Sequence, residues 1–292
     1  KSIKDAEVVF ITVGTPVDPQ EGPMMRDVLD VTEGVGKALR RGSLVILRST
    51  VPPGTTEEVV RPRLESLSGL RCEEDFGLAF CPERLVEGKA LEELVTMTEI
   101  VGGVGPKSAE AAANFFEALG NPVVKTASPR VAEMAKIFDN VYRDVNIALA
   151  NELALICEKF GVDIMQVREL GNTGPRTRLL IPGAGVGGSC LNKDPVMLAY
   201  LARQRGVRAS LLEAARERNL SMPQHVIDLV KSAYSEMKKE IKGSKVAALG
   251  LAFKDETDDL RNNVAQPIVM GLQSLGARVV VHDPYVRPEV AQ

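Results

Sequence analysis

The sequence feature that most constrains the fold is the stretch from Pro129 to Phe160, which contains no glycine and no proline after its first residue. It is rich in alanine, glutamate and asparagine, and its apolar residues keep a helical spacing throughout. The sequence on either side has a different character, with short apolar runs and turn residues. We therefore expect one long spine helix that links two domains of another type.

The segments before this helix alternate between strand and helix patterns. Residues 8–13 and 44–48 are short apolar runs that end in turn residues, which is typical of buried strands. Helical patterns follow each of them, at 27–39 and 55–67. This alternation predicts a parallel sheet with helices on both faces. Two further strand-like pieces and a helix are expected at 77–80, 122–125 and 107–119.

The sequence after the spine helix contains a second helical group over 194–237 and then a new β-α-β pattern over 245–283. We expect an α/β protein in which two Rossmann-like, doubly wound domains are joined by an all-helical central domain. The expected boundaries are 1–128, 129–240 and 241–292. A doubly wound domain does not begin at an inner strand or end after two strands, so further residues are expected on each side of the chain.

Composition excludes several classes of function. With 45% hydrophobic and 26% charged residues and a net charge of −3, the chain has no basic footprint for nucleic acid or an anionic membrane. No apolar run approaches the roughly 20 residues that a transmembrane helix needs, and the first residues are not a signal peptide, so we expect a cytoplasmic protein. The two histidines and four dispersed cysteines form no zinc pattern, so no metal is expected.

A glycine-rich loop, residues 183–189, is the most informative segment of the chain. Gly183, Gly185 and Gly188 satisfy the spacing G-x-G-x-x-G. We do not interpret it as a dinucleotide fingerprint, because Pro182 interrupts the preceding run and the third glycine is not expected to open a helix. The glycines instead give the backbone freedom to adopt positive φ angles and to approach a ligand closely.

This loop ends at Cys190, which we interpret as a reactive thiol. Lys193 follows closely, and a nearby cation favours the thiolate, which is the nucleophilic form. The alternative is that Cys190 is a small buried hydrophobic residue, which is the interpretation we prefer for Cys72, Cys81 and Cys157.

Two further sets of polar residues are candidates for chemistry. Lys136 and Asn140 are four residues apart on the expected spine helix and share a face, and Arg143 and Asp144 continue the polar stripe. A solvated helix face would give the same pattern. Glu83 follows an expected strand, where carboxylates often face the ligand crevice of α/β folds, although a surface loop charge is the alternative.

Several of these segments resemble the UDP-glucose/GDP-mannose dehydrogenase family. The run Gly-Gly-Ser-Cys-Leu-Asn-Lys-Asp at 187–194 resembles the family's nucleophile loop. The other similar segments, in chain order, are the two cofactor-side turns, the substrate loop, the spine helix and the entry to the nucleotide-sugar domain, at 13–16, 48–54, 80–90, 132–152 and 250–261. The resemblance therefore runs through the whole chain in the same order.

The resemblance implies an NAD-dependent enzyme that oxidises the C6 alcohol of a UDP-sugar to a carboxylate for polysaccharide synthesis. Two hydride transfers would occur, with a thioester on the cysteine between them and its hydrolysis at the end. Segments 80–90 and 132–152 are most similar to the UDP-N-acetylmannosamine branch. Ser189 and the pair Lys193–Asp194 are more similar to the UDP-glucose and GDP-mannose branches, which are therefore the alternatives.

The resemblance also implies roles for individual residues. Catalysis would use Cys190, Lys136, Asn140, Asp194, Glu83 and Thr50. Substrate binding would use Glu83, Arg84, Leu85, Arg176, Gly187 and Lys254. NAD binding would use Thr15, Pro16, Thr50, Lys193 and Arg261. In this scheme Lys136 and Asn140 stabilise the oxyanion, and Asp194 is a base or the partner of Lys136. Glu83 and Thr50 help to position the hydrolytic water.

Three further expectations follow. The family's glycine-rich dinucleotide turn would lie before Lys1, so this stretch by itself is expected to bind NAD poorly. The spine helices are expected to pair in a homodimer through an apolar stripe formed by Met134, Ile137, Val141, Val145 and Leu149. Two rival functions remain, a decarboxylating 3-hydroxyacid dehydrogenase, which needs no cysteine, and a non-catalytic assembly module in which Cys190 is buried.

Overall fold

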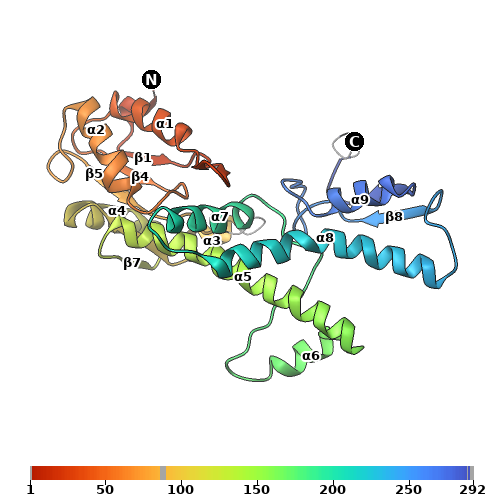
Figure 1. Cartoon of the computed structure of the whole chain (residues 1–292). Helices are drawn as coiled ribbons and strands as arrows, with labels where there is room; N and C mark the ends of the chain where they lie inside the picture. Colours follow the sequence, from red (N-terminus) through yellow and green to blue (C-terminus); the bar gives the residue numbers. More distant parts are fainter. Residues whose placement is uncertain (1, 86–89, 288, 290–292) are drawn as a thin grey trace. The chain divides into compact units, whose positions relative to one another are not determined.

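A computed structural model describes residues 2–85, 90–287 and 289 (Figure 1). The chain forms two compact units. The first contains residues 1–139 and 200–206, and the second contains residues 140–199 and 207–292. The long spine helix α5 (Pro129–Phe160) contributes its first turns to the first unit and the remainder to the second.

The first unit contains a five-stranded sheet in the order β1-β4-β5-β6-β7. Strands β1, β4 and β5 are parallel, as the alternating pattern predicted. Strand β6 runs antiparallel to β5, and β7 is parallel to β6, so the expectation of a wholly parallel sheet is wrong at this edge. The strands span Val8–Ile11, Leu44–Leu47, Gly77–Phe80, Glu99–Gly103 and Val123–Lys125.

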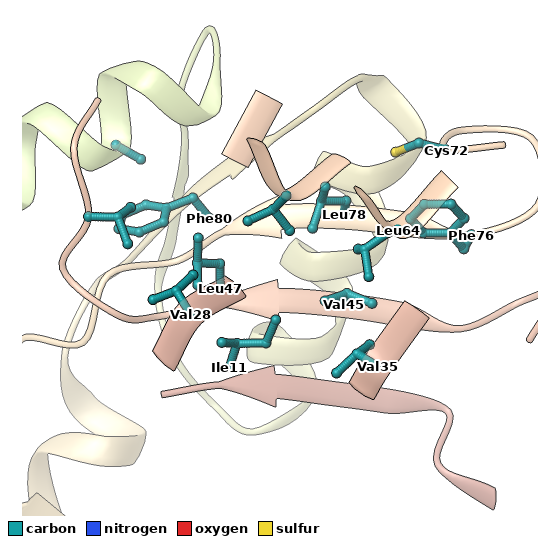
Figure 2. Close-up of a cluster of buried hydrophobic side chains, with 13 residues drawn as sticks. Ile11, Val28, Val35, Val45, Leu47, Leu64, Cys72, Phe76, Leu78 and Phe80 are labelled. Carbon is teal, nitrogen blue, oxygen red and sulfur yellow. The ribbon is translucent and has the colours of Figure 1, made fainter. Parts of the chain in front are cut away.

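Helices cover both faces of this sheet, so the inner strand β4 buries side chains on each side. Val45 and Leu47 pack on one face with residues of α1 (Arg26–Gly36) and α2 (Arg61–Ser68), as Figure 2 shows. Leu44 and Ile46 pack on the other face with α4 (Pro106–Ala118). A strand buried on both faces is typical of a doubly wound α/β sheet, and the expected fold class is therefore confirmed.

Smaller elements complete the first unit. They are the 3₁₀ helix η1 (Ser2–Asp5), the short antiparallel pair β2 (Val17–Asp18) and β3 (Gly22–Pro23), the π-helical turn η2 (Thr56–Val60) and helix α3 (Ala90–Thr96). The two-stranded pair and α3 were not expected from the sequence.

The second unit is mainly helical. After α5 it contains α6 (Ile164–Gly171), α7 (Cys190–Arg203) up to residue 199, and α8 (Ser210–Glu236). A β-α-β unit follows, in which β8 (Lys245–Leu249) and β9 (Arg278–His282) pair in parallel and α9 (Ala265–Ser274) connects them. Its apolar residues pack on Ile227 of α8. Within the described residues, no helix combines the length and apolar character that crossing a membrane requires.

Candidate active site

The two predicted cofactor turns lie next to each other at one edge of the sheet. Each follows the carboxyl end of a parallel strand, β1 or β4. The Ser49 hydroxyl donates a hydrogen bond to the Val13 carbonyl at 2.6 Å, and the buried Thr15 hydroxyl donates to the Thr50 carbonyl. Pro16 is exposed beside Thr15. Ligands of doubly wound folds bind at this edge of the sheet.

The predicted substrate loop begins at the same edge, because β5 is parallel to β4. Glu83 is exposed, and its carboxylate accepts a hydrogen bond from the Leu85 amide. Arg84 donates to the Thr98 carbonyl. The rest of this predicted loop, residues 86–89, lies outside the described residues.

A buried ion pair, which the sequence analysis missed, supports this loop. Arg48 follows β4 and is 3.0 Å from Glu99 of β6, with both side chains almost fully buried. The same guanidinium lies 3.5 Å from the Pro82 carbonyl and over the ring of Phe116. The pair therefore connects the turn that carries Thr50 to the loop that carries Glu83.

A buried carboxylate holds the other end of that turn. Glu133 of α5 is fully buried and accepts hydrogen bonds from the Gly54 amide and from the amide and hydroxyl of Thr56, the latter two at 2.9 and 2.6 Å. Burial raises the pKa of Glu133, and the hydrogen bonds from Thr56 oppose that rise. This residue was also missed, although it lies three positions before Lys136 and extends the same polar helix face.

The polar stripe of α5 is buried rather than solvated. Lys136 is 7% exposed, Asn140 3% and Asp144 0%, and these residues are separated by one turn each. The alternative of a solvated face is therefore wrong for these three positions. Arg143, in contrast, is exposed and does not belong to the buried stripe.

Asp194 links α5 to the segment after the glycine-rich loop. Its carboxylate accepts a hydrogen bond from Asn140 Nδ2 at 2.6 Å, and its other oxygen is 2.6 Å from Lys193 Nζ. Asp194 is fully buried, whereas Lys193 is partly accessible. The structure thus brings together three residues predicted for the site. The expected pairing of Asp194 with Lys136 stays a prediction.

Cys190 is the first residue of α7 and is exposed. Its sulfur is 3.8 Å from the Ser189 hydroxyl. The alternative of a buried Cys190 is therefore wrong. As the first residue of α7, Cys190 lies at the end of the helix where the backbone amides face outward.

Two of the other cysteines differ from Cys190 as expected. Cys72 and Cys81 are buried, and burial raises the pKa of both thiols. Cys157 is half-buried.

One argument against a dinucleotide fingerprint in the glycine loop needs correction, because α7 does open shortly after Gly188. The loop nevertheless follows no strand among the described residues 161–189.

The glycine-rich loop packs against the segment between β8 and α9. A side chain at Gly187 would collide with Phe253, and Gly188 has a φ of +79°. The Gly188 amide donates to the Arg261 carbonyl at 3.0 Å. Predicted ligands Lys254 and Arg261 belong to this packed segment, although the Arg261 guanidinium binds Asp259, with Nε 2.8 Å from Oδ2. Arg176 is exposed in the loop after α6.

Comparison with known proteins assigns this arrangement to a family. Family models match the NAD binding domain over residues 1–120, the central domain over 130–221 and the UDP binding domain over 247–292. All three belong to one family. Their order is the order in which the sequence analysis expected a cofactor-side, a helical and a nucleotide-sugar region.

Individual relatives support the same assignment. The chain is 39% identical to the UDP-N-acetyl-D-mannosamine dehydrogenase of Pyrococcus horikoshii, over 98% of this chain and 68% of that protein. It is 35% identical to the UDP-N-acetyl-D-glucosamine 6-dehydrogenase of Pseudomonas aeruginosa, over 100% of this chain and 69% of that protein. A solved structure of the P. horikoshii UDP-D-ManNAc dehydrogenase matches with a TM-score of 0.91 at 38% identity, covering 98% of this chain and 67% of that one.

The chain spans about two thirds of the length of these relatives. The matches cover its NAD-binding, central and UDP-binding regions without a change of order. The chain therefore belongs to the UDP-glucose/GDP-mannose dehydrogenase family of NAD-dependent nucleotide-sugar dehydrogenases.

Proposed function

We propose that the protein carrying this chain oxidises the C6 alcohol of UDP-N-acetylmannosamine to the carboxylate, through a thioester on Cys190. The observation that carries this proposal is the exposed Cys190 thiol at the N-terminus of α7, at the end of a glycine-rich loop. Two relatives that match nearly the whole chain are named as dehydrogenases of UDP-N-acetylhexosamines, and these names support the substrate class. UDP-glucose and GDP-mannose are the alternative substrates.

The cysteine serves the second half of the reaction. After the first oxidation, the Cys190 thiolate adds to the C6 aldehyde, forming a C–S bond and an oxyanion that takes up a proton. Removal of a second hydride and a proton from this thiohemiacetal leaves a thioester. Water then adds to the thioester carbonyl, and the C–S bond breaks to release the carboxylate and the free thiol. The covalent bond retains the aldehyde between the two oxidations.

Several polar residues of the chain suit the proton and charge changes of these steps. We assign oxyanion stabilisation to Lys136 and Asn140, because both are buried donors on one face of α5. The Asn140 amide has two hydrogens, so its bond to Asp194 leaves one for a substrate oxygen. We assign proton transfer to Asp194, and positioning of the hydrolytic water to Glu83 and Thr50.

We place the NAD molecule at the cofactor-side turns. They lie at the carboxyl ends of β1 and β4, where doubly wound folds bind dinucleotides. NAD⁺ would supply the hydride acceptor for both oxidations. We assign contacts with it to Thr15 and Pro16 on the first turn and Thr50 on the second. Lys193 and Arg261 stay proposed ligands from the remainder of the chain.

The remaining assignments concern the substrate and the domains. We propose that the nucleotide sugar contacts Glu83, Arg84, Leu85, Arg176, Gly187 and Lys254. The matched family regions support domains at 1–128, 129–240 and 241–292, which we retain as a proposal. We also propose a cytoplasmic location and a role in polysaccharide precursor synthesis, which is consistent with an enzyme that uses NAD and activated sugars.

The substrate proposal can be tested by NADH release from the full-length protein. UDP-N-acetylmannosamine, UDP-N-acetylglucosamine, UDP-glucose and GDP-mannose are compared at equal concentration, with absorbance at the NADH band as the signal. UDP-N-acetylmannosamine is expected to give the highest kcat/KM. A higher kcat/KM for UDP-glucose or GDP-mannose would contradict the assignment to the N-acetylhexosamine branch, and no NADH with any of the four would contradict the proposed activity.

We further propose a homodimer that pairs through α5, with an apolar stripe that keeps Leu149 but otherwise differs from the one expected. Ile137 is fully buried within its own chain, so it is not available to a partner. The exposed apolar residues of α5 include Phe138, Tyr142, Leu149, Ile156 and Phe160, at spacings of four and seven residues that place them on one helix face.

Substituting Leu149 with glutamate places a charge in the middle of this face, and we expect it to halve the molar mass of the full-length protein in solution. Multi-angle light scattering after size exclusion measures this mass. Leu119→Glu, which changes an exposed leucine just after α4, is the matched control and should leave a dimer. A dimeric Leu149→Glu protein, or a monomeric unsubstituted one, would overturn the proposed interface.

A further inference from the structure

The second unit contains a buried polar network that the proposed reaction does not use. It begins at Asp144 of α5, which is fully buried and 2.6 Å from Nη1 of Arg216 on α8. Burial raises the pKa of Asp144, and the Arg216 charge opposes this rise. Asn219, one turn after Arg216, donates to the same carboxylate oxygen at 2.8 Å. Taking both charges of such a pair out of water costs free energy, so the segments that a buried ion pair connects are of interest.

The network continues from Arg216 into the segment that carries the thiol. The other terminal nitrogen of the Arg216 guanidinium, Nη2, donates to Asn192 Oδ1 at 2.6 Å. Asn192 lies two residues after Cys190, in the first turn of α7. Its Nδ2 donates to two carbonyls of the glycine-rich loop, Val186 at 3.1 Å and Gly188 at 2.7 Å. One asparagine therefore connects the loop before the thiol to the buried ion pair.

The guanidinium also fixes which way the Asn192 amide points. Arginine has only donors, so it can bind the amide oxygen but not the amide nitrogen. With the oxygen held by Arg216, the nitrogen must face the two loop carbonyls, where a donor is needed. Flipping the amide would place donor against donor and acceptor against acceptor. Arg216 and Asp144 thus determine a hydrogen-bond direction rather than adding one more contact.

A parallel connection holds the start of the same loop. Asn219 accepts a hydrogen bond from Asn151 Nδ2 at 3.0 Å, and Asn151 Oδ1 accepts one from the Gly183 amide at 2.8 Å. Asn151 and Asn219 are both almost fully buried. The loop 183–189 is therefore anchored at its first residue and near its last, and both anchors end at Asp144.

We propose that Asn192 is a positioning residue for Cys190, with Arg216 and Asp144 as its orienting support. This inference rests on the proposed role of Cys190 as the nucleophile. The loop is rich in glycine and would otherwise be free to move, while a nucleophile must be held close to its attack geometry. Misplacement by about 1 Å can lower a catalytic rate by roughly 10²-fold.

The test is Asn192→Asp in the full-length protein, which keeps an acceptor for Arg216 but loses the donor to the two carbonyls. We expect kcat to fall by at least about tenfold, while KM for the nucleotide sugar and for NAD stays within about twofold. The rate at which iodoacetamide modifies Cys190, followed by peptide mass spectrometry without substrate, should change by at least about fivefold, because the loop before the thiol loses its anchor. Arg216→Lys should also change both rates, because lysine lacks the planar fork that binds Asp144 and Asn192 together. The change should be smaller than for Asn192→Asp, because lysine keeps the positive charge.

Asn121→Asp is the matched control. Asn121 is also buried, and its Nδ2 also donates to two backbone carbonyls, those of Leu94 and Met97 at 2.7 and 3.1 Å. It should lower the melting temperature about as much as Asn192→Asp but leave the rate of Cys190 modification unchanged. If both variants alter that rate equally, or neither does, the positioning role is overturned.

The two proposals can fail separately. The modification rate needs no turnover, so it reports on the loop even if Cys190 is not the nucleophile. A Cys190→Ala protein that still forms the carboxylate would overturn the proposed function. An inactive Cys190→Ala protein, together with an Asn192→Asp protein whose kcat and modification rate match the unsubstituted one, would overturn the positioning role alone.

Discussion

Replacing Cys190 with alanine in the full-length protein is expected to lower kcat for formation of the carboxylate by at least about 10³-fold. Without the sulfur, no C–S bond holds the aldehyde for its second oxidation. The exposed position of this thiol at the start of α7 makes it the cysteine that a substrate can reach. The product is measured by mass spectrometry of the nucleotide sugars after incubation with NAD⁺.

The control for this prediction is Cys157→Ala, which removes a half-buried thiol that has no proposed role. It should leave the rate within about twofold of the unsubstituted protein, as substitutions outside the reacting groups commonly do. Carboxylate formation at the normal rate by Cys190→Ala would exclude covalent catalysis by this thiol.

The largest effect on stability is expected from Arg48→Met. This change leaves the Glu99 carboxylate buried and without its cation, which should lower the local free energy of unfolding by about 3–5 kcal/mol. The chain has two units and need not unfold in one step. Hydrogen-exchange mass spectrometry in urea, on peptides that contain β4 and β6, is therefore the suitable measurement.

Two controls separate burial from charge in this prediction. The double variant Arg48→Met/Glu99→Leu should recover most of the lost stability, because apolar side chains often replace a buried ion pair without loss. Lys125→Met breaks a pair with Glu110 that is 2.6 Å long but exposed, and should leave the stability nearly unchanged. A loss of less than 1 kcal/mol for Arg48→Met would show that the pair does not hold the two segments together.

Regular hydrophobic patterns allowed much of the fold to be predicted. Strands β1, β4 and β5 are continuous apolar runs, and α5 is a long helix without interruption, so their positions follow from spacing and composition alone. The class of fold follows from the alternation of these elements. The same reasoning identified Cys190, because a cysteine among glycines and next to a lysine is unusual for a core residue.

Strand β6 was missed because its sequence lacks the usual signals. Two of its five residues are Gly102 and Gly103, which allow α4 and α5 to approach the strand closely. It begins with Glu99, a charge that is depleted in strands and that is buried here only because Arg48 pairs with it. The sequence does not show that these two residues, 51 positions apart, meet in the fold. The antiparallel direction of β6 was missed because the strand itself was not predicted.

The supporting residues of the candidate site were harder to predict than the reactive ones. Asn192, Arg216 and Asp144 come from two helices and a loop that are far apart in the sequence, and isolated Asn, Arg and Asp residues are common on surfaces. Spacing could show that Asp144 shares a face with Asn140, but not that this face is buried. Burial and hydrogen-bond direction are tertiary properties, and they distinguish these residues from solvated ones.

The central claim is that the Cys190 thiol carries the sugar between two oxidations. The most direct test is peptide mass spectrometry of the full-length protein, quenched with acid during turnover of UDP-N-acetylmannosamine and NAD⁺. The account predicts that the peptide containing Cys190 gains the mass of the C6 acyl nucleotide sugar as a thioester, and that hydroxylamine removes it. An unmodified Cys190 peptide throughout turnover, while two NADH and one carboxylate form per sugar, would contradict the account.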